Sequence, residues 1–135
     1  MKKILVFFSL CVFMACSPKK DAEPQTAMDA GRAFIRASLD GDFKAAEPLL
    51  LKDAENEQLF ESYKRSYSHL EDAKKQEYKA ASYNINKFED LNDSTTIVNY
   101  SNSYMNKPME IKLVRTGGKW MVDFKYTFAG NLPID

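Results

Sequence analysis

The sequence is poor in the residues on which metal sites and disulfide bonds depend. Its 135 residues include two cysteines and one histidine. Structural zinc sites usually need several Cys or His ligands, and both cysteines lie within the first 16 residues. The sequence therefore excludes a His/Cys metal cluster and a disulfide framework in the rest of the chain, where stability must come from packing. We expect no cofactor.

The sequence also lacks a surplus of charge of one sign. It has 19 basic and 19 acidic residues, and the basic residues form no stripe. Proteins that bind nucleic acid usually carry a strongly basic surface. We therefore expect no nucleic-acid partner.

The longest apolar run of the sequence stands near its start, behind two lysines. This run, residues 4–15, is shorter than the roughly 20 residues with which a helix crosses a membrane. Two basic residues before a short apolar run are typical of a secretory signal peptide, and Ala15-Cys16 resembles the lipobox of bacterial lipoproteins. We predict a signal peptide over residues 1–15 and lipid attachment at Cys16. The alternative is an ordinary secreted protein with a chance cysteine at its cleavage site.

The residues that follow divide into a polar segment and a folded domain. Residues 16–25 are rich in Lys, Pro and acidic residues and have almost nothing apolar to bury, which predicts a flexible tether. Residues 26–135 carry the apolar residues in regular patterns. A segment of about 110 residues is expected to form one domain.

Apolar residues first recur with the period of a helix. Thr26 is suited to cap the first turn of a helix, and Gly41 and Asp42 are suited to end it and to start the next one. A third apolar stripe follows, with residues spaced three and four apart. The sequence therefore predicts three helices, at about residues 26–39, 43–51 and 55–74.

After about Tyr78 the apolar residues alternate with polar ones, as in a β-strand. Gly117-Gly118 is typical of a two-residue hairpin turn, and a strand through Phe128 is expected after it. This turn places apolar residues opposite apolar ones and opposite charges together. The predicted pairs are Leu113–Val122, Ile111–Phe124 and Met109–Tyr126 on one face, and Lys112–Asp123 and Glu110–Lys125 on the other.

A second turn, at Asn106-Lys107, extends the pattern upstream. A first strand is expected at about residues 78–88. Three N-terminal helices packed on a curved four-stranded antiparallel sheet make an α+β fold. The pairs predicted for the second turn include Tyr104–Met109 and Tyr100–Leu113.

Two motifs carry a resemblance to a known fold. They are Leu39-Asp40-Gly41-Asp42-Phe43 at the first helix junction and Gly-Gly-Lys-Trp at residues 117–120 in the last hairpin. In this order, behind a lipobox, they resemble the nuclear-transport-factor-2-like fold and, more narrowly, small lipoprotein domains of unknown function from Bacteroidetes. The resemblance implies a cone-shaped pocket between helices and sheet, and for many members a dimer through the outer sheet face.

The same resemblance bears on location. Residues 17–20 read Ser-Pro-Lys-Lys and are not the acidic cluster associated with surface export in that phylum. We therefore expect a lipid-anchored protein of the cell envelope, at the outer membrane and facing the periplasm.

Some proteins of this fold are enzymes, so acidic and basic side chains need separate attention. An isomerase of this kind needs a carboxylate base in a dry pocket, but Glu110 and Asp123 fall on the polar face, opposite lysines. His69 is expected to be a packing residue beside an apolar helix face, and no nucleophile-elbow motif is present. We expect a non-catalytic protein. The alternative is a small isomerase or hydrolase with an unrecognised site in the pocket.

Six side chains are expected to point from the inner face of the sheet into the pocket. Tyr and Trp offer apolar contact with a polar tip, and an amide can orient a ligand. They are candidates for the lining of a site for a small apolar ligand. The same rings could instead fill the core, which would leave the outer face around Val114 and Met121 for a protein partner or a second copy. The six pocket candidates are Tyr83, Tyr100, Asn102, Tyr104, Trp120 and Tyr126.

Overall fold

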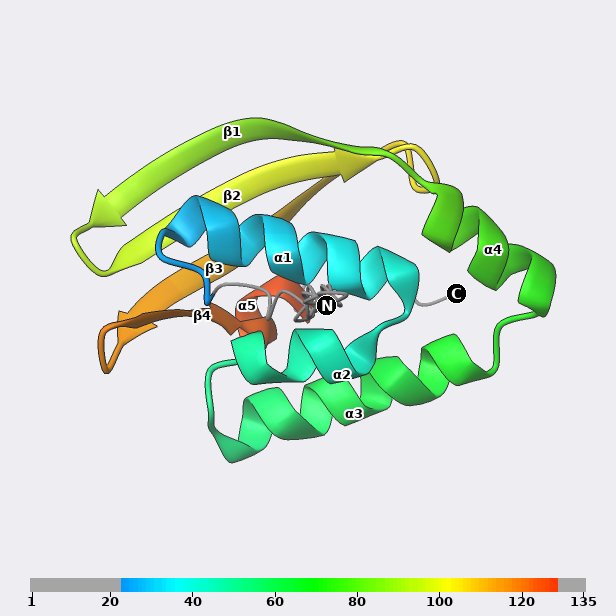
Figure 1. Ribbon diagram of the computed structural model, residues 1–135, viewed down its shortest axis with the longest axis horizontal. Coiled ribbons are helices and arrows are strands. Elements are labelled where there is room, and N and C mark those ends of the chain that lie inside the picture. Colours follow the sequence, from blue (N-terminus) through cyan, green and yellow to red (C-terminus); the bar gives the residue numbers. More distant parts are fainter. Residues whose placement is uncertain (1–22, 129–135) are drawn as a thin grey trace, which may run out of the picture.

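The computed structural model describes residues 23–128 and has the α+β class that the sequence predicts (Figure 1). The predicted signal peptide and Cys16 lie outside these residues. In chain order the described elements are α1 (Ala27–Asp40), α2 (Phe43–Ala46), the 3-10 helix η1 (Glu47–Leu49), α3 (Ala54–Ser68), α4 (Asp72–Ala80), β1 (Tyr83–Asn92), β2 (Thr95–Asn102), β3 (Pro108–Thr116), β4 (Lys119–Asp123) and α5 (Phe124–Phe128).

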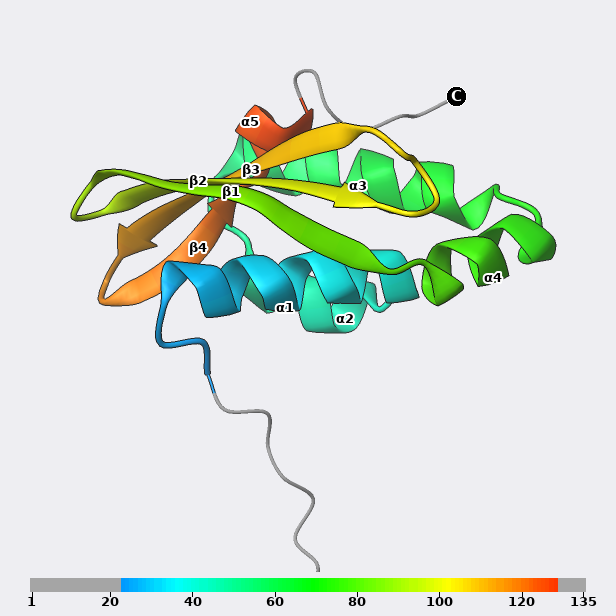
Figure 2. The same cartoon turned by 90° about the horizontal axis from the view of Figure 1, so that it is seen from above.

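The strands form an antiparallel sheet in the order β1-β2-β3-β4. Helix α1 packs on the inner face of this sheet, against β3 and β4, while α5 packs between β3 and α3 (Figures 1 and 2). The edge of the sheet at β4 is covered by the residues that follow η1. Leu50 forms a parallel bridge with Val122, and the Leu51 N–H donates to the Val122 carbonyl at 2.9 Å. β1 is the other edge of the sheet.

The predicted signals at the ends of α1 are confirmed. The Thr26 side chain accepts a hydrogen bond from the Asp29 N–H at 3.1 Å. Gly41 ends the helix with a φ of 68°, in the left-handed region that favours glycine. Asp42 then caps α2 by accepting from the Ala45 N–H at 3.1 Å. The second helix is shorter than predicted, since Pro48 lies in η1 rather than in a continued α-helix.

The third predicted helix is wrong in its extent, because residues 55–74 belong to two helices. Helix α3 ends at Ser68 and α4 begins at Asp72. Tyr78 lies in α4, so the prediction of a strand from residue 78 is also wrong, and the helices do not all precede the sheet, because α5 follows it. The connection between α3 and α4 is stabilised by Lys75, whose Nζ donates to the Ser68 carbonyl at 3.1 Å.

The end of α4 is held by a residue that is distant in sequence. Arg36, on α1, donates to the Lys79 carbonyl and to the Ala81 carbonyl, at 3.0 Å in each case. These bonds fix the last turn of α4 to the middle of the fold. Such long-range support explains why the local pattern around residue 78 did not predict a helix.

The β3–β4 hairpin has the predicted register but is shorter than predicted. Lys112 lies opposite Asp123 and Leu113 opposite Val122. The strand then ends and α5 begins, because the Lys125 N–H donates to the buried Asn56 side chain at 2.8 Å. The predicted pairs Ile111–Phe124, Met109–Tyr126 and Glu110–Lys125 are therefore wrong.

The β2–β3 register differs from the prediction by four residues. Tyr100 lies opposite Met109, not Leu113, and Tyr104 lies beyond the end of β2. The connection is longer than a two-residue turn, and the Asn102 side-chain oxygen accepts from the Tyr104 and Met105 N–H groups at 3.1 and 2.8 Å. A shift by an even number of residues keeps every side chain on its predicted face, so Tyr100 still faces inward.

The core is built around aromatic rings. The ring centroids of Phe60 and Phe124 are 5.3 Å apart, with the rings at 90°, and Phe34 lies 6.0 Å from Phe124. All three are buried. Edge-to-face pairs of this kind contribute about 0.5–1.5 kcal/mol each beyond their burial. They join α1, α3 and α5 into one cluster.

Gly41 offers a test of how tightly the helices are packed. A Cβ on Gly41 would lie 2.6 Å from Cζ of Tyr67, whereas a Cβ on Gly117, at a φ of 56°, would meet nothing within 4 Å. Both Gly→Ala changes carry the strain of a left-handed residue, about 1–2 kcal/mol, but only Gly41→Ala adds a clash. We expect Gly41→Ala to lower the free energy of unfolding by about 2 kcal/mol more than Gly117→Ala, measured by urea unfolding. Equal losses would contradict this packing.

Candidate functional site

The space beside Tyr100 and Asn102, where a pocket was predicted, is almost filled. Both residues are buried, and with Tyr63, Tyr78 and Thr127 they line a void of about 20 Å³. A void of this size holds about one water molecule. The side-chain oxygen of Asn102 accepts hydrogen bonds within the β2–β3 turn, so this residue stabilises the fold. The inner rings therefore belong to the core.

The other predicted pocket residues do not come together. Tyr83 is half-buried on β1, and Trp120 is half-buried opposite Arg115 near the end of the β3–β4 hairpin. Tyr126 is 39% exposed, and its hydroxyl donates to Glu110 at 2.9 Å. Since β4 gives way to α5 after Asp123, the strand alternation that placed Tyr126 on the inner face no longer applies. Of the six candidates, Tyr104 is the one that reaches an open site.

That site is a groove of about 990 Å³ between the C-terminal part of α3, α4 and the β2–β3 turn. Figure 1 shows how α4 folds back from the end of α3 toward the start of β1. The volume lies within the range of small-molecule sites, about 300–1,000 Å³. The tyrosines that line the groove are Tyr63, Tyr67, Tyr78 and Tyr104.

The rings of the groove are packed against one another. The centroids of Tyr78 and Tyr104 lie 4.3 Å apart, and those of Tyr67 and Tyr78 lie 6.2 Å apart with the rings nearly perpendicular. The Tyr78 hydroxyl also contacts Sδ of Met105, at 3.7 Å. Burial raises the pKa of Tyr78 and of Tyr67 above its ordinary value, so these phenols stay neutral at physiological pH. The wall they form is apolar with hydroxyl tips.

The rest of the lining is mixed. Leu70 and Met105 add apolar surface, while His69, Lys74 and Glu77 supply ionisable groups. The last three are exposed, so these groups remain in contact with water. The groove can thus bind an apolar group on its rings and leave a polar group of the same molecule near its rim.

The groove could have been partly predicted from the sequence. Tyr63 and Tyr67 lie on the predicted apolar stripe of the third helix, although the site depends on the break after Ser68. One signal for that break is Glu71-Asp72, because acidic residues are common in the first turn of a helix. No local signal indicates that Tyr104 and Met105 lie outside the sheet and form one wall of the groove.

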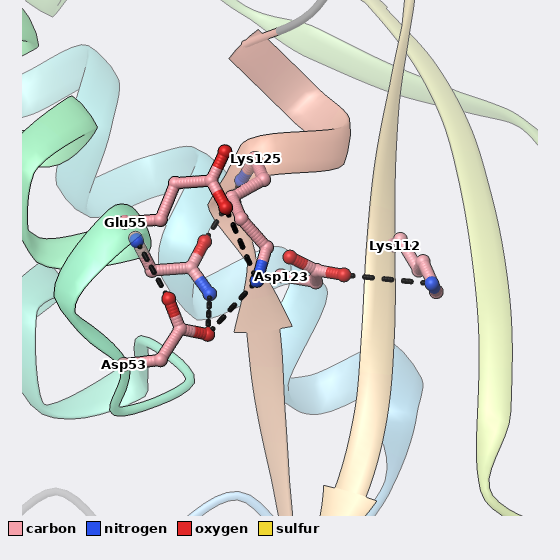
Figure 3. Close-up of polar contacts among 6 residues, drawn as sticks. Asp53, Glu55, Lys112, Asp123 and Lys125 are labelled. Carbon is pink, nitrogen blue, oxygen red and sulfur yellow. Dashed lines mark hydrogen bonds and ion pairs between the residues drawn. The ribbon is translucent and has the colours of Figure 1, made fainter.

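A second cluster of polar residues lies at the other end of α3 (Figure 3). Asp53 caps α3 by accepting from the Asn56 N–H at 2.9 Å and accepts from Nζ of Lys125 at 3.0 Å. Asn56 is fully buried and donates to Asp53 at 2.8 Å. The predicted ion pair between Lys112 and Asp123 lies beside this cluster, with 3.4 Å between Nζ and Oδ2. These contacts fix α5 to α3 and to the sheet.

Metal binding and membrane crossing concern the same residues, 23–128. This part of the chain has no group of three or more His, Cys, Asp or Glu side chains placed to hold a metal ion. It also has no helix that is long and apolar enough to cross a membrane.

The chain matches no family model, no curated protein and no solved structure. The groove has the volume and lining of a binding site, whereas the polar cluster holds α3, α5 and the sheet together.

The polar cluster makes the stability of the protein sensitive to acid. The Asn56 N–H, and then Lys125, hold the pKa of Asp53 below its ordinary value of 3.8. A depressed pKa stabilises the fold above the unfolded-state value, and this contribution is lost as the pH falls through the folded-state value. We expect Asp53→Asn to flatten the loss of stability below a pH of about 4, measured by urea unfolding.

The control is Asp72→Asn, since the Asp72 side chain is 94% exposed. This variant should keep the acid dependence of the unchanged protein. An Asp53→Asn protein with that same acid dependence would contradict the role given to Asp53.

Proposed function

We propose that the chain is a lipid-anchored envelope protein that binds a small apolar ligand in the groove, without catalysing a reaction. The observation that carries the proposal is the ring-lined groove of about 990 Å³ between α3, α4 and the β2–β3 turn. Neutral tyrosine rings give a ligand broad apolar contact and fixed hydroxyl groups. The anchor is proposed from the lipobox-like Ala15-Cys16.

A binding role accounts for the side chains better than an enzymatic one. A base of the isomerase type works in a dry pocket, but the groove residues His69 and Glu77 are exposed. The sheet carboxylates have other partners, because Glu110 accepts from Tyr126 and Asp123 pairs with Lys112. The arrangement supports contact with a ligand rather than proton transfer.

The position of the groove suits a tethered protein. Helix α1 begins at the end of the domain opposite α4 (Figures 1 and 2). A lipid on Cys16, ahead of α1, would leave the α4 end of the domain free. We propose that the groove is the mouth of a nuclear-transport-factor-2-like cone that opens to the periplasm from the outer membrane.

Ligand binding can be tested with an apolar fluorescent probe, N-phenyl-1-naphthylamine. We expect its fluorescence to rise on binding and to saturate at one probe per chain. Tyr104→Ala removes a ring that packs against Tyr78 and should weaken binding about fivefold or more. The readout is the dissociation constant from a titration.

The control variant is Phe88→Ala, which removes a 37% exposed ring on β1, outside the groove. It should leave probe binding unchanged. Probe binding that is absent, or that is lost equally in both variants, would rule out the groove as the binding site.

The proposed anchor predicts a change of fraction. Only a thiol forms the thioether to the lipid, and two or three acyl chains hold a protein firmly on a membrane. We expect Cys16→Ser to move the protein from the membrane pellet to the soluble fraction of the envelope, and to abolish labelling by palmitate. Cys11→Ser is the matched control and should change neither. A Cys16→Ser protein that still takes up palmitate would contradict the assignment.

A further inference from the structure

The strand β1 is an edge of the sheet without a neighbour in the described chain. The sheet order is β1-β2-β3-β4, and the opposite edge at β4 is bridged by Leu50. An edge strand presents backbone N–H and C=O groups that can pair with another strand. β1 is ten residues long, so this edge is extensive.

The exposed apolar side chains concentrate on the same strand. Among residues 23–127, the exposed large hydrophobic side chains are Phe88 at 37%, Tyr126 at 39% and Leu91 at 54%. Tyr126 is engaged by Glu110, whereas Phe88 and Leu91 both lie on β1. An apolar ring and an apolar chain on an open edge favour a protein contact.

Natural edge strands are usually protected by lysines or by bulges. β1 has register shifts between Ile85 and Lys87 and between Asp90 and Asn92, but the segment between them pairs regularly with β2. The lysine in that segment is not an unmatched charge, because Lys87 forms an ion pair with Glu89. The protection is therefore incomplete at residues 87–90.

We propose that two copies of the chain associate through this segment, antiparallel, with Phe88 opposite Phe88 of the second copy. In this register Lys87 of each copy lies opposite Glu89 of the other, which gives two cross-strand ion pairs. A symmetric contact must be self-complementary, and the order basic, apolar, acidic around Phe88 meets that condition.

The outer sheet face fits a second copy less well. Its central positions on β2 and β3 include Asn99, Ser101, Glu110 and Lys112, which are polar or charged, and its apolar residues are half-buried. The edge combines an exposed ring, matched charges and unpaired backbone groups. The dimer at β1 is independent of what the groove binds.

A disulfide test reads the proposed register directly. Residues 23–128 contain no cysteine, so Phe88→Cys places one thiol per domain at the proposed twofold axis. Residues opposed in antiparallel strands have Cα atoms about 4.5–5.5 Å apart, within the range of a disulfide. We expect the full chain with Phe88→Cys to form a covalent dimer under diamide, seen on a non-reducing gel.

Leu91→Cys is the matched control because Leu91 is more exposed than Phe88 and lies on the same strand. In the proposed register two copies of residue 91 are about 20 Å apart and cannot form a disulfide. Equal cross-linking of the two variants would show random collision and overturn the proposal. So would the absence of a Phe88→Cys dimer, or a stronger dimer through Met121→Cys on the outer face.

Charge reversal tests the two ion pairs. In the Phe88→Cys protein, Lys87→Glu or Glu89→Lys alone sets like charges opposite each other twice and should reduce the covalent dimer about tenfold. When the two variants are co-expressed with different tags, each restores the charge that the other lacks, so a mixed dimer should form. If neither single variant lowers the dimer, or if the mixed dimer is no more abundant than the single-variant dimers, the register is wrong.

Discussion

The burial of Phe124 at the end of β4 is the constraint on which the rest of the structure depends. Asp123 still belongs to the sheet and pairs with Lys112, but the next ring lies among Phe34 and Phe60 in the core. The strand ends there and α5 begins, so the Lys125 N–H needs a partner outside the sheet. A buried donor without one costs about 1–3 kcal/mol. Asn56 supplies that partner.

This exit determines the position of α3, and α3 determines the groove. Asn56 and Asp53 attach the start of α3 to α5, so the direction of the helix is set at its first turn. The helix is 15 residues long and ends at Ser68, after which α4 turns back. The groove lies in the angle between the two helices. Its shape thus follows from polar contacts at the opposite end of α3.

Local chemistry in the sequence predicts much of the fold. Thr26, Gly41 and Asp42 mark helix ends because each acts on its own backbone or on a near neighbour. Gly117-Gly118 gives the register of the last hairpin for the same reason. The inner and outer faces of β2 were also predicted correctly, although its register was wrong, because the error was an even number of residues.

Features that depend on distant residues could not be predicted in this way. The exit from β4 requires Asn56, and the last turn of α4 requires Arg36 from α1. The predicted pocket failed for a related reason. The alternation of apolar and polar residues places Tyr100 and Asn102 on the inner face of the sheet. Whether a pocket remains there depends on how closely α1 and α5 approach that face, and the spacing of residues in the sequence does not show this. The groove lies between α3 and α4, whose separation at Ser68 was not predicted, so the pattern indicated only the tyrosines of its α3 wall.

Two tyrosines belong both to the core and to the groove, which limits how these positions can vary in evolution. Tyr63 and Tyr78 line both the small internal void and the groove, so the floor of the groove is also a wall of the core. A substitution there would change core packing and, under the proposed function, ligand binding as well, so both would constrain it. Leu70, Tyr104 and Met105 border the groove alone. Descendants of this protein that acquire different ligands would therefore vary at these rim positions and keep the two tyrosines of the floor.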